Sequence, residues 1–166
     1  DRGKERLAVH RHAARHLDDQ AKLRADRSLI PNFIEETLRL EGTIKTGYRL
    51  TKVRAEVGGV DCAPGTPVMI IVSAINRDPT KFENPNTLQL DRQNAREHLA
   101  FGRGIHACIG APLARAELKV TLERLFDRTA DLRFDEAMHG PAGARKLDYV
   151  PSYMARGLSE LHIDHD

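Results

Sequence analysis

Apolar positions recur with a helical period in three parts of the chain. Spacings of three and four over residues 14–25 predict an amphipathic surface helix, with its apolar stripe at Ala14, Leu17, Ala21 and Ala25. Pro31 suits the first turn of a second helix, which the pattern carries through Leu40. Residues 111–127 form two adjoining apolar stripes, which predict a third helix buried over much of its circumference.

Strand-like patterns lie between the second and third helices. Residues 53–57, a Gly58-Gly59 turn and Val60 predict a hairpin, with the β-branched run 68–75 as its buried strand. Residues 76–104 hold Asn-Arg-Asp-Pro and Asn-Pro-Asn, which predict loops. After residue 132 the pattern indicates only short strand-like pieces around a Gly-Pro loop.

Composition narrows the function classes. The 166 residues suit one domain, and 26 basic against 24 acidic residues give a net charge of +2, which argues against a dedicated nucleic-acid binder. The longest apolar run, residues 68–72, is far too short for a membrane span. Only two cysteines are present and the start lacks an apolar signal core, so we expect a cytoplasmic protein without a disulfide framework.

Two histidines in the first predicted helix have a spacing that can bind zinc. His12 and His16 are four residues apart, which places both imidazoles on one helix face. The glutamate of a zinc-protease helix is missing between them, so a solvated helix face is the simpler interpretation.

The stretch with the clearest chemistry is 101–110, Phe-Gly-Arg-Gly-Ile-His-Ala-Cys-Ile-Gly. Cys108 stands just before a predicted helix, where unpaired N–H groups and the helix dipole favour a thiolate. Glycines at 102, 104 and 110 let the backbone approach something flat and bulky. A thiolate in such a loop can serve as a nucleophile or as a metal ligand.

Residue context leaves three alternatives for this cysteine. A nucleophile needs a base and an orienting group, yet His106 is only two residues away and no cysteine-protease pattern surrounds it. Zinc needs four ligands, of which Cys108, His106 and His98 supply three. A buried structural cysteine is the third alternative.

The spacing Phe101-x-x-Gly104-x-His106-x-Cys108-x-Gly110 resembles the haem-ligand signature of the cytochrome P450 family, the haem-thiolate monooxygenases. Upstream, Glu36-Thr-Leu-Arg39 resembles the family's E-x-x-R helix. The family's N-R-D-P loop, F-x-x-P segment and following arginine appear in order as residues 76–79, 82–85 and Arg92. The resemblance covers roughly residues 14–163 and is closest to soluble bacterial members.

The resemblance implies a role for each matched residue around haem b. Cys108 would be the axial iron ligand, and its thiolate would favour O–O cleavage by pushing electron density toward the iron. Phe101 would shield the sulfur from water, and with Gly102 and Gly110 it would line the proximal haem face. Arg49 and His106 would hydrogen-bond the haem propionates, a role that suits cationic donors.

Other matched positions are implied to support the site. Glu36, Arg39 and Arg92 would form a buried structural triad on the proximal side. Four further residues match segments that usually touch substrate: Thr43, Ile44, Met154 and Ala155.

The family implies a mainly α fold with a small β portion (α+β), of which residues 1–166 would form one region, the C-terminal part on the proximal haem side. Residues 1–13 would be a divergent or non-native start. The intact protein would insert one oxygen atom of O2 into a small organic substrate, with electrons from a ferredoxin-type or flavin reductase donor.

One expected element of an active monooxygenase is not found in this sequence. The A-G-x-x-T pattern of the family's distal helix does not occur in residues 1–30. We therefore expect the isolated chain to fold poorly and to be inactive. The alternatives are a haem-thiolate sensor or binding module, and a truncated or vestigial product without catalytic activity.

Overall fold

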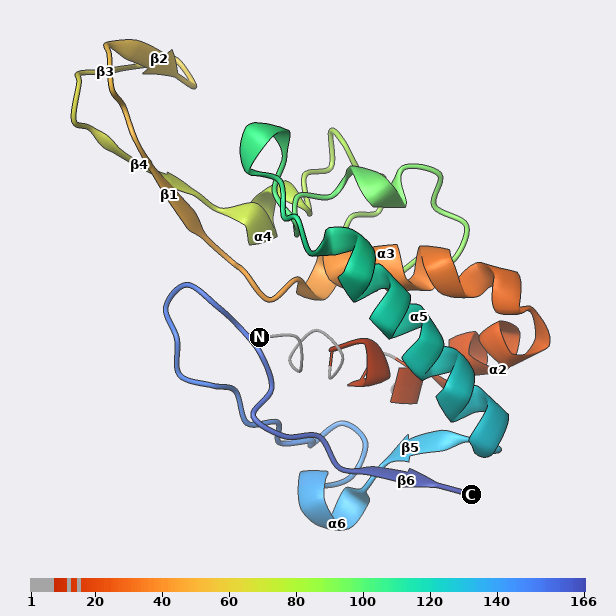
Figure 1. Cartoon of the computed structure of the whole chain (residues 1–166). Helices are drawn as coiled ribbons and strands as arrows, with labels where there is room; N and C mark the ends of the chain where they lie inside the picture. The colour runs from red at the N-terminus through yellow and green to blue at the C-terminus, as the bar shows by residue number, and fades with distance from the viewer. Residues whose placement is uncertain (1–7, 12, 15) are drawn as a thin grey trace.

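A computed structural model of the chain describes residues 8–11, 13–14 and 16–166. Its centre is formed by helices α3 (Ile30–Glu41) and α5 (Ala111–Arg128), with α2 (Leu17–Ala25) beside them (Figure 1). One apolar core joins the three helices to strand β5 (Leu132–Phe134). The fold is mainly helical with small strands, as predicted.

Helix α3 confirms the second predicted helix. Pro31 lies in its first turn, and nine of its twelve residues are buried, including Glu35, Glu36 and Arg39. The helix ends at Gly42, where a Cβ atom would lie 2.8 Å from the carbonyl oxygen of Leu38. This buried helix therefore carries charged side chains inside the protein, and each of them needs a partner.

Helix α5 confirms the third predicted helix, but its predicted burial is wrong. Leu118, Leu122 and Phe126 are buried, whereas Leu113 and Val120 of the other apolar stripe are about half exposed. Only one stripe of this helix packs against α3 and the rest of the core.

The apolar stripe predicted for the first helix is also wrong. In α2 the buried residues are Gln20 and Leu23, while Leu17 is exposed. Gln20 is satisfied inside the protein because its amide bonds the carbonyl oxygens of Ala13 and Leu132, at 3.2 and 3.0 Å, and accepts from the Leu132 N–H at 2.9 Å. His12 of the proposed histidine pair lies outside the described residues.

The described strands form three two-stranded antiparallel sheets. Strands β2 (Ala55–Val57) and β3 (Val60–Cys62) confirm the hairpin around Gly58-Gly59. Strand β1 (Gly47–Leu50) pairs with β4 (Pro67–Ile70), and β5 pairs with β6 (Ile163–His165).

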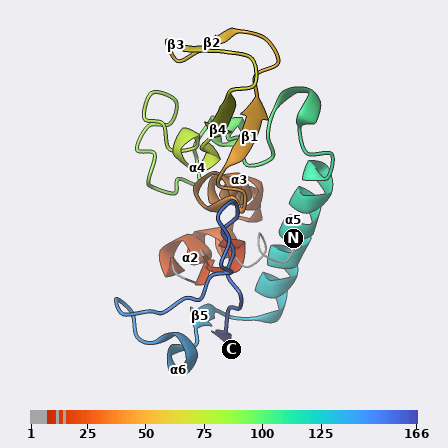
Figure 2. The same cartoon turned by 90° about the vertical axis from the view of Figure 1, so that its left-hand side faces the viewer.

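The predicted buried strand 68–75 is wrong. It ends at Ile70, is only partly buried, and is followed by the short helix α4 (Val72–Ile75). Its partner is β1, with Tyr48 opposite Met69. The β1–β4 ribbon projects away from α2 and α5, with the β2–β3 hairpin at its far end (Figures 1 and 2).

Loops occupy most of residues 76–110, as predicted, with 3₁₀ turns η2 (Ala95–Glu97) and η3 (Gly104–His106). Another 3₁₀ turn, η1 (Arg27–Leu29), joins α2 to α3, and helix α6 (Glu136–His139) follows β5. The tail returns toward the start of β1 through an isolated bridge between Ile44 and Ala155. No helix in the described part of the chain is long and apolar enough to cross a membrane.

Candidate cofactor site

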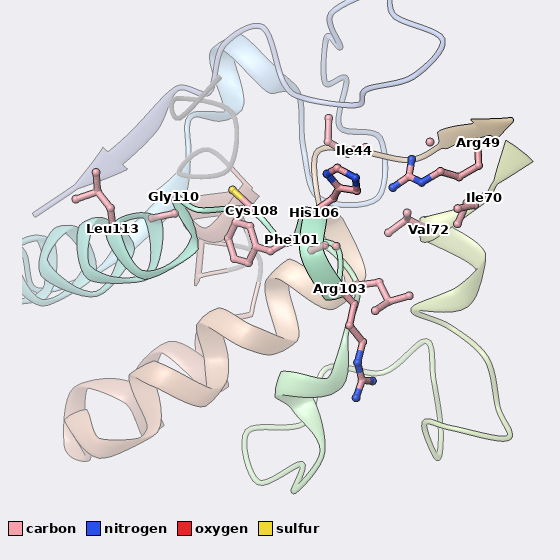
Figure 3. A pocket seen from close by; sticks show the side chains of 15 residues that line it. Ile44, Arg49, Ile70, Val72, Phe101, Arg103, His106, Cys108, Gly110 and Leu113 are labelled. Atoms are coloured by element: carbon pink, nitrogen blue, oxygen red, sulfur yellow. The ribbon is translucent and has the colours of Figure 1, made fainter. Parts of the chain in front are cut away.

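A cavity of about 730 Å³ lies between the cysteine loop, the start of α5 and the facing ends of β1 and β4 (Figure 3). Its lining is mainly apolar, and the residues with large apolar side chains are Ile44, Ile70, Val72, Leu99, Phe101 and Leu113. Cys108 also lines it, and its side chain is exposed. The cavity therefore places one sulfur atom against an apolar space of cofactor size.

The cysteine loop is shaped by two glycines in the left-handed region. Gly102 has a φ of +69° and Gly104 a φ of +77°, values that other residues rarely adopt. Two backbone hydrogen bonds close the loop: the Ala107 N–H donates to the Gly104 oxygen at 3.0 Å, and the Cys108 N–H donates to the Phe101 oxygen at 2.8 Å. This backbone presents Cys108 three residues before α5 begins.

The ionisable side chains that line the cavity, apart from Cys108, are all basic. Arg49, Arg103 and His106 line it, and no carboxylate is among its described lining residues. Arg49 and His106 point toward one another, whereas Arg103 points away from them (Figure 3). Among the described residues, the Arg49 side chain bonds only the neighbouring Tyr48 oxygen, at 2.8 Å, so its guanidinium is available for an anion.

The structure brings Glu36, Arg39 and Arg92 together inside the protein. Arg39 donates from Nε and Nη2 to the two Glu36 oxygens at 2.6 and 2.9 Å, and Arg92 Nε lies 2.9 Å from Glu36 Oε1. Burial opposes the charged form of Glu36, but the hydrogen bonds from Arg39 and the nearby Arg92 guanidinium outweigh it and hold the pKa of this carboxyl below its ordinary value.

The two arginines also bind the long loop that follows α4. Arg39 donates to three backbone carbonyls and Arg92 to three, with Thr87 shared between them; the acceptors are Asn76, Glu83, Asn84, Pro85 and Thr87. These bonds hold a loop without regular structure against α3, in the part of the chain that leads to the cysteine loop.

The four residues matched to substrate segments lie close together, but only one lines the cavity. Ile44 is part of the lining and is bridged to Ala155. Thr43 is buried, and its carbonyl oxygen accepts from Arg156 at 2.7 Å. Met154 is half exposed, and its carbonyl oxygen accepts from Lys45 at 2.9 Å.

The contacts of the other candidate ligands weaken the zinc alternative. His98 is buried and bonded to Glu35 at 3.0 Å, not directed to Cys108. The second cysteine, Cys62, is buried on β3. Within the described residues, no group of three or more histidine, cysteine, aspartate or glutamate side chains could hold a metal ion.

Sequence reasoning missed a group of contacts beside the cysteine loop. Glu35 is buried and receives hydrogen bonds from His98 and Arg115. Burial opposes its ionised form, yet these bonds prevail and lower the pKa of Glu35 to about 2. The available signal was a second glutamate next to Glu36 on a buried helix, since a buried carboxylate requires partners.

Comparisons with known proteins agree with this arrangement. The family described as Cytochrome P450 matches residues 5–129. Cytochrome P450 monooxygenase PikC of Streptomyces venezuelae is 37% identical over 149 residues, which cover 89% of this chain and 34% of PikC. Vitamin D3 dihydroxylase of Streptomyces griseolus is 44% identical over 149 residues, covering 89% of this chain and 35% of that protein. Substrate-free cytochrome P450 CYP150A6 of Mycobacterium marinum has a TM-score of 0.97 at 50% identity, covering 99% of this chain and 41% of the other.

A mainly helical fold with a glycine-shaped cysteine loop on an apolar cavity is that of a haem-thiolate protein, and this chain belongs to the cytochrome P450 family. Proteins of this family hold haem iron through a cysteine thiolate. The chain spans about a third of the length of the curated relatives it matches.

The residues present fit such a cofactor. Haem needs a thiolate, flat apolar walls and cationic partners for two carboxylates. The cavity offers Cys108, an apolar lining and the facing pair Arg49 and His106. At Gly110 a Cβ atom would lie 3.7 Å from the Cys108 sulfur, so the absence of a side chain there leaves the space beside the sulfur open.

Proposed function

We propose that residues 1–166 form one region of a haem-thiolate monooxygenase, the region on the thiolate side of the haem. The observation that carries this proposal is the exposed Cys108 side chain on an apolar cavity that Arg49 and His106 also line. Bound haem supplies the redox chemistry by which one oxygen atom of O2 enters an organic substrate.

The chain's own residues would bind, orient and shield. Cys108 would hold the iron as a thiolate, placed by its N–H bond to the Phe101 oxygen. The half-buried Phe101 ring would limit water near the sulfur. Arg49 and His106 would bind the two carboxylates through charge-assisted hydrogen bonds.

The remaining parts would support the site or meet the substrate. Glu36, Arg39 and Arg92 would hold the loop beneath the cysteine segment, a structural role outside the chemistry. Ile44 would touch a small organic substrate, and Thr43, Met154 and Ala155 would shape the segment beside it. The electron donor would be a ferredoxin-type or flavin reductase protein, which is what membership of the family implies.

We also propose that these 166 residues bind haem without oxygenating a substrate. The chain spans about a third of the length of its curated relatives, and Ile105 and Ile109 of the cysteine loop are 96% and 100% exposed. These apolar side chains beside the cavity face water, whereas an oxygen-activating site excludes water. A haem-binding module without catalytic activity is therefore the second candidate function for the chain alone.

The test is incubation of the chain with haemin, followed by reduction and carbon monoxide. We expect a thiolate-type carbonyl spectrum that disappears in Cys108→Ser and persists in Cys62→Ser, the matched control at a cysteine outside the cavity. Failure of the unchanged chain to take up haem would overturn the proposal.

Turnover separates the two candidate functions. The haem-loaded chain, supplied with NADH, a ferredoxin and its reductase, is expected to give no oxygenated product from a panel of small organic substrates. Product that depends on Cys108 would contradict the proposed inactivity and establish the chain as an enzyme.

A further inference from the structure

Beside the site lies a buried network that no step above uses. Glu35 of α3 has a side chain that is only 3% exposed, and it accepts hydrogen bonds from Arg115 Nε at 2.6 Å and Nη2 at 3.0 Å. His98 Nε2 lies 3.0 Å from its second oxygen. One carboxylate thus connects α3, the loop after η2 and the first turns of α5.

The hydrogen bonds of His98 define its tautomer. Its Nδ1 faces the Ala100 N–H at 3.1 Å, and because a backbone N–H can only donate, Nδ1 is the acceptor. The ring proton therefore lies on Nε2 and is donated to Glu35. Every polar atom of this buried imidazole has a partner, and the ring orientation is fixed from both sides.

The network reaches the cysteine through one aromatic ring. The Arg115 guanidinium carbon lies 4.8 Å from the centre of the Phe101 ring, and the His98 ring centre lies 6.2 Å from it. The backbone carbonyl oxygen of Phe101 in turn accepts a hydrogen bond from the Cys108 N–H at 2.8 Å. Arg115 is therefore bonded to Glu35 through two N–H groups and also lies over the Phe101 ring, a combination that lysine cannot reproduce.

We propose that Glu35, His98 and Arg115 form a clamp that positions Phe101 and, through it, the Cys108 sulfur. All three are positioning residues, because no described hydrogen bond joins any of them directly to Cys108. The inference rests on the proposed function, in which Cys108 holds haem. It assigns the two neighbouring glutamates of α3 separate tasks, because Glu36 binds the 76–92 loop whereas Glu35 binds His98 and Arg115, which lie before and after the cysteine loop.

The test is a double-mutant cycle in a Cys62→Ser background, so that Cys108 is the only thiol. The single variants are Arg115→Ala and Phe101→Leu, and the same cycle is built with Arg115→Lys, which keeps the charge. In the haem-free chain, the rate of Cys108 alkylation by iodoacetamide reports the placement of the sulfur. In the haem-loaded chain, the fraction with a thiolate-type carbonyl spectrum reports ligation.

Control variants separate positioning from charge and from stability. Arg124→Ala removes an exposed arginine from the same helix, and Glu123→Gln neutralises a glutamate there. Glu35→Gln keeps the shape of the buried side chain but turns an amide N–H toward one of its donors. Circular dichroism of each variant identifies any that fail to fold, and the Arg115→Lys cycle then replaces Arg115→Ala.

We expect Arg115→Ala, Arg115→Lys and Glu35→Gln each to change the alkylation rate by about threefold to tenfold, equal to about 0.7–1.4 kcal/mol, and to lower the thiolate-type fraction. The effect of Arg115 should largely disappear when Phe101 is already leucine. Additive effects, or full rescue by lysine, would overturn the clamp. Because alkylation needs no haem, a failed clamp remains distinguishable from a chain that binds no haem.

Discussion

Replacing Arg39 with lysine tests the buried network of α3 most directly. All five guanidinium N–H groups are used: two bond Glu36 at 2.6 and 2.9 Å. The other three bond backbone carbonyls at 2.6, 2.9 and 3.2 Å. A lysine ammonium has three donors on a flexible stem, so at least two of these acceptors lose the hydrogen bond that Arg39 supplies.

The expected cost follows from burial. The side chains of Arg39 and Glu36 are 0% exposed, and damage to a buried ion pair costs about 3–5 kcal/mol. Domains have total free energies of unfolding of about 5–15 kcal/mol, so a loss of about 3–5 kcal/mol from Arg39→Lys is at least about a fifth of the total. Arg54 is the matched control, because its Nη1 lies 2.9 Å from Asp61 although the two side chains are 72% and 61% exposed. Arg54→Lys should cost less than about 1 kcal/mol.

Urea unfolding followed by far-ultraviolet circular dichroism at pH 7 measures both variants against the unchanged chain. The free energy in water and its urea dependence are obtained from the same curves. If Arg39→Lys cost no more than Arg54→Lys, the reasoning would be refuted, because the two arginines differ chiefly in burial and in their number of bonds.

Three further predictions concern the carboxylate beside the site, the cysteine loop and the cavity. The pKa of Glu35 is about 2 in the folded chain against an ordinary 4.5. Its ionised form therefore stabilises the fold by about 3 kcal/mol above pH 4.5. This contribution is lost as the pH falls from 4.5 toward 2. Urea unfolding over that range should show Glu35→Gln less stable at pH 7 and converging with the unchanged chain near pH 2; parallel curves would contradict this. Gly102→Ala should lower the free energy of unfolding by about 1–2 kcal/mol, because the φ of Gly102 is +69°. Gly47→Ala is the control and should leave the free energy of unfolding unchanged or raise it, because the new Cβ meets nothing within 4 Å and the φ of Gly47 is not positive. Equal effects of the two substitutions would show that the cysteine loop relaxes. Arg49→Leu should weaken haem binding about tenfold in a titration, while Arg54→Leu, outside the cavity, should leave it unchanged; an unaltered Kd for Arg49→Leu would remove Arg49 from the site.

The elements most accurately predicted from the sequence are those whose determinants are local. The boundaries of α3 and α5 follow from Pro31 and Pro112 in their first turns and from apolar spacings within each helix. The β2–β3 hairpin follows from the Gly58-Gly59 turn, where both glycines have positive φ. In each case neighbouring residues alone decide the backbone conformation.

Burial was predicted less well because it depends on what lies opposite. A β-branched run predicts a buried strand, yet Ile70 and Val72 line the cavity instead of a second layer of the protein. Leu113 of α5 lines the same cavity, which accounts for the exposure of part of its second stripe. Gln20 shows the converse, since a polar side chain is buried where strand β5 supplies backbone partners.

The candidate site shows the same contrast between local and tertiary determinants. The cysteine loop could be predicted because ten consecutive residues determine it: left-handed glycines, a histidine, and a thiol before a helix. The clamp could not, because Glu35 and Arg115 are 80 positions apart and no spacing in the sequence connects them. Glu35 and Arg115 individually resemble a surface glutamate and a helix arginine. The carboxylate gains its partners only when α3 packs against α5 and against the loop that carries His98. In the proposed function, neighbouring residues specify the ligand Cys108, whereas tertiary structure fixes its placement. We therefore expect substitutions at Arg115 to disturb ligation while the signature around Cys108 remains intact.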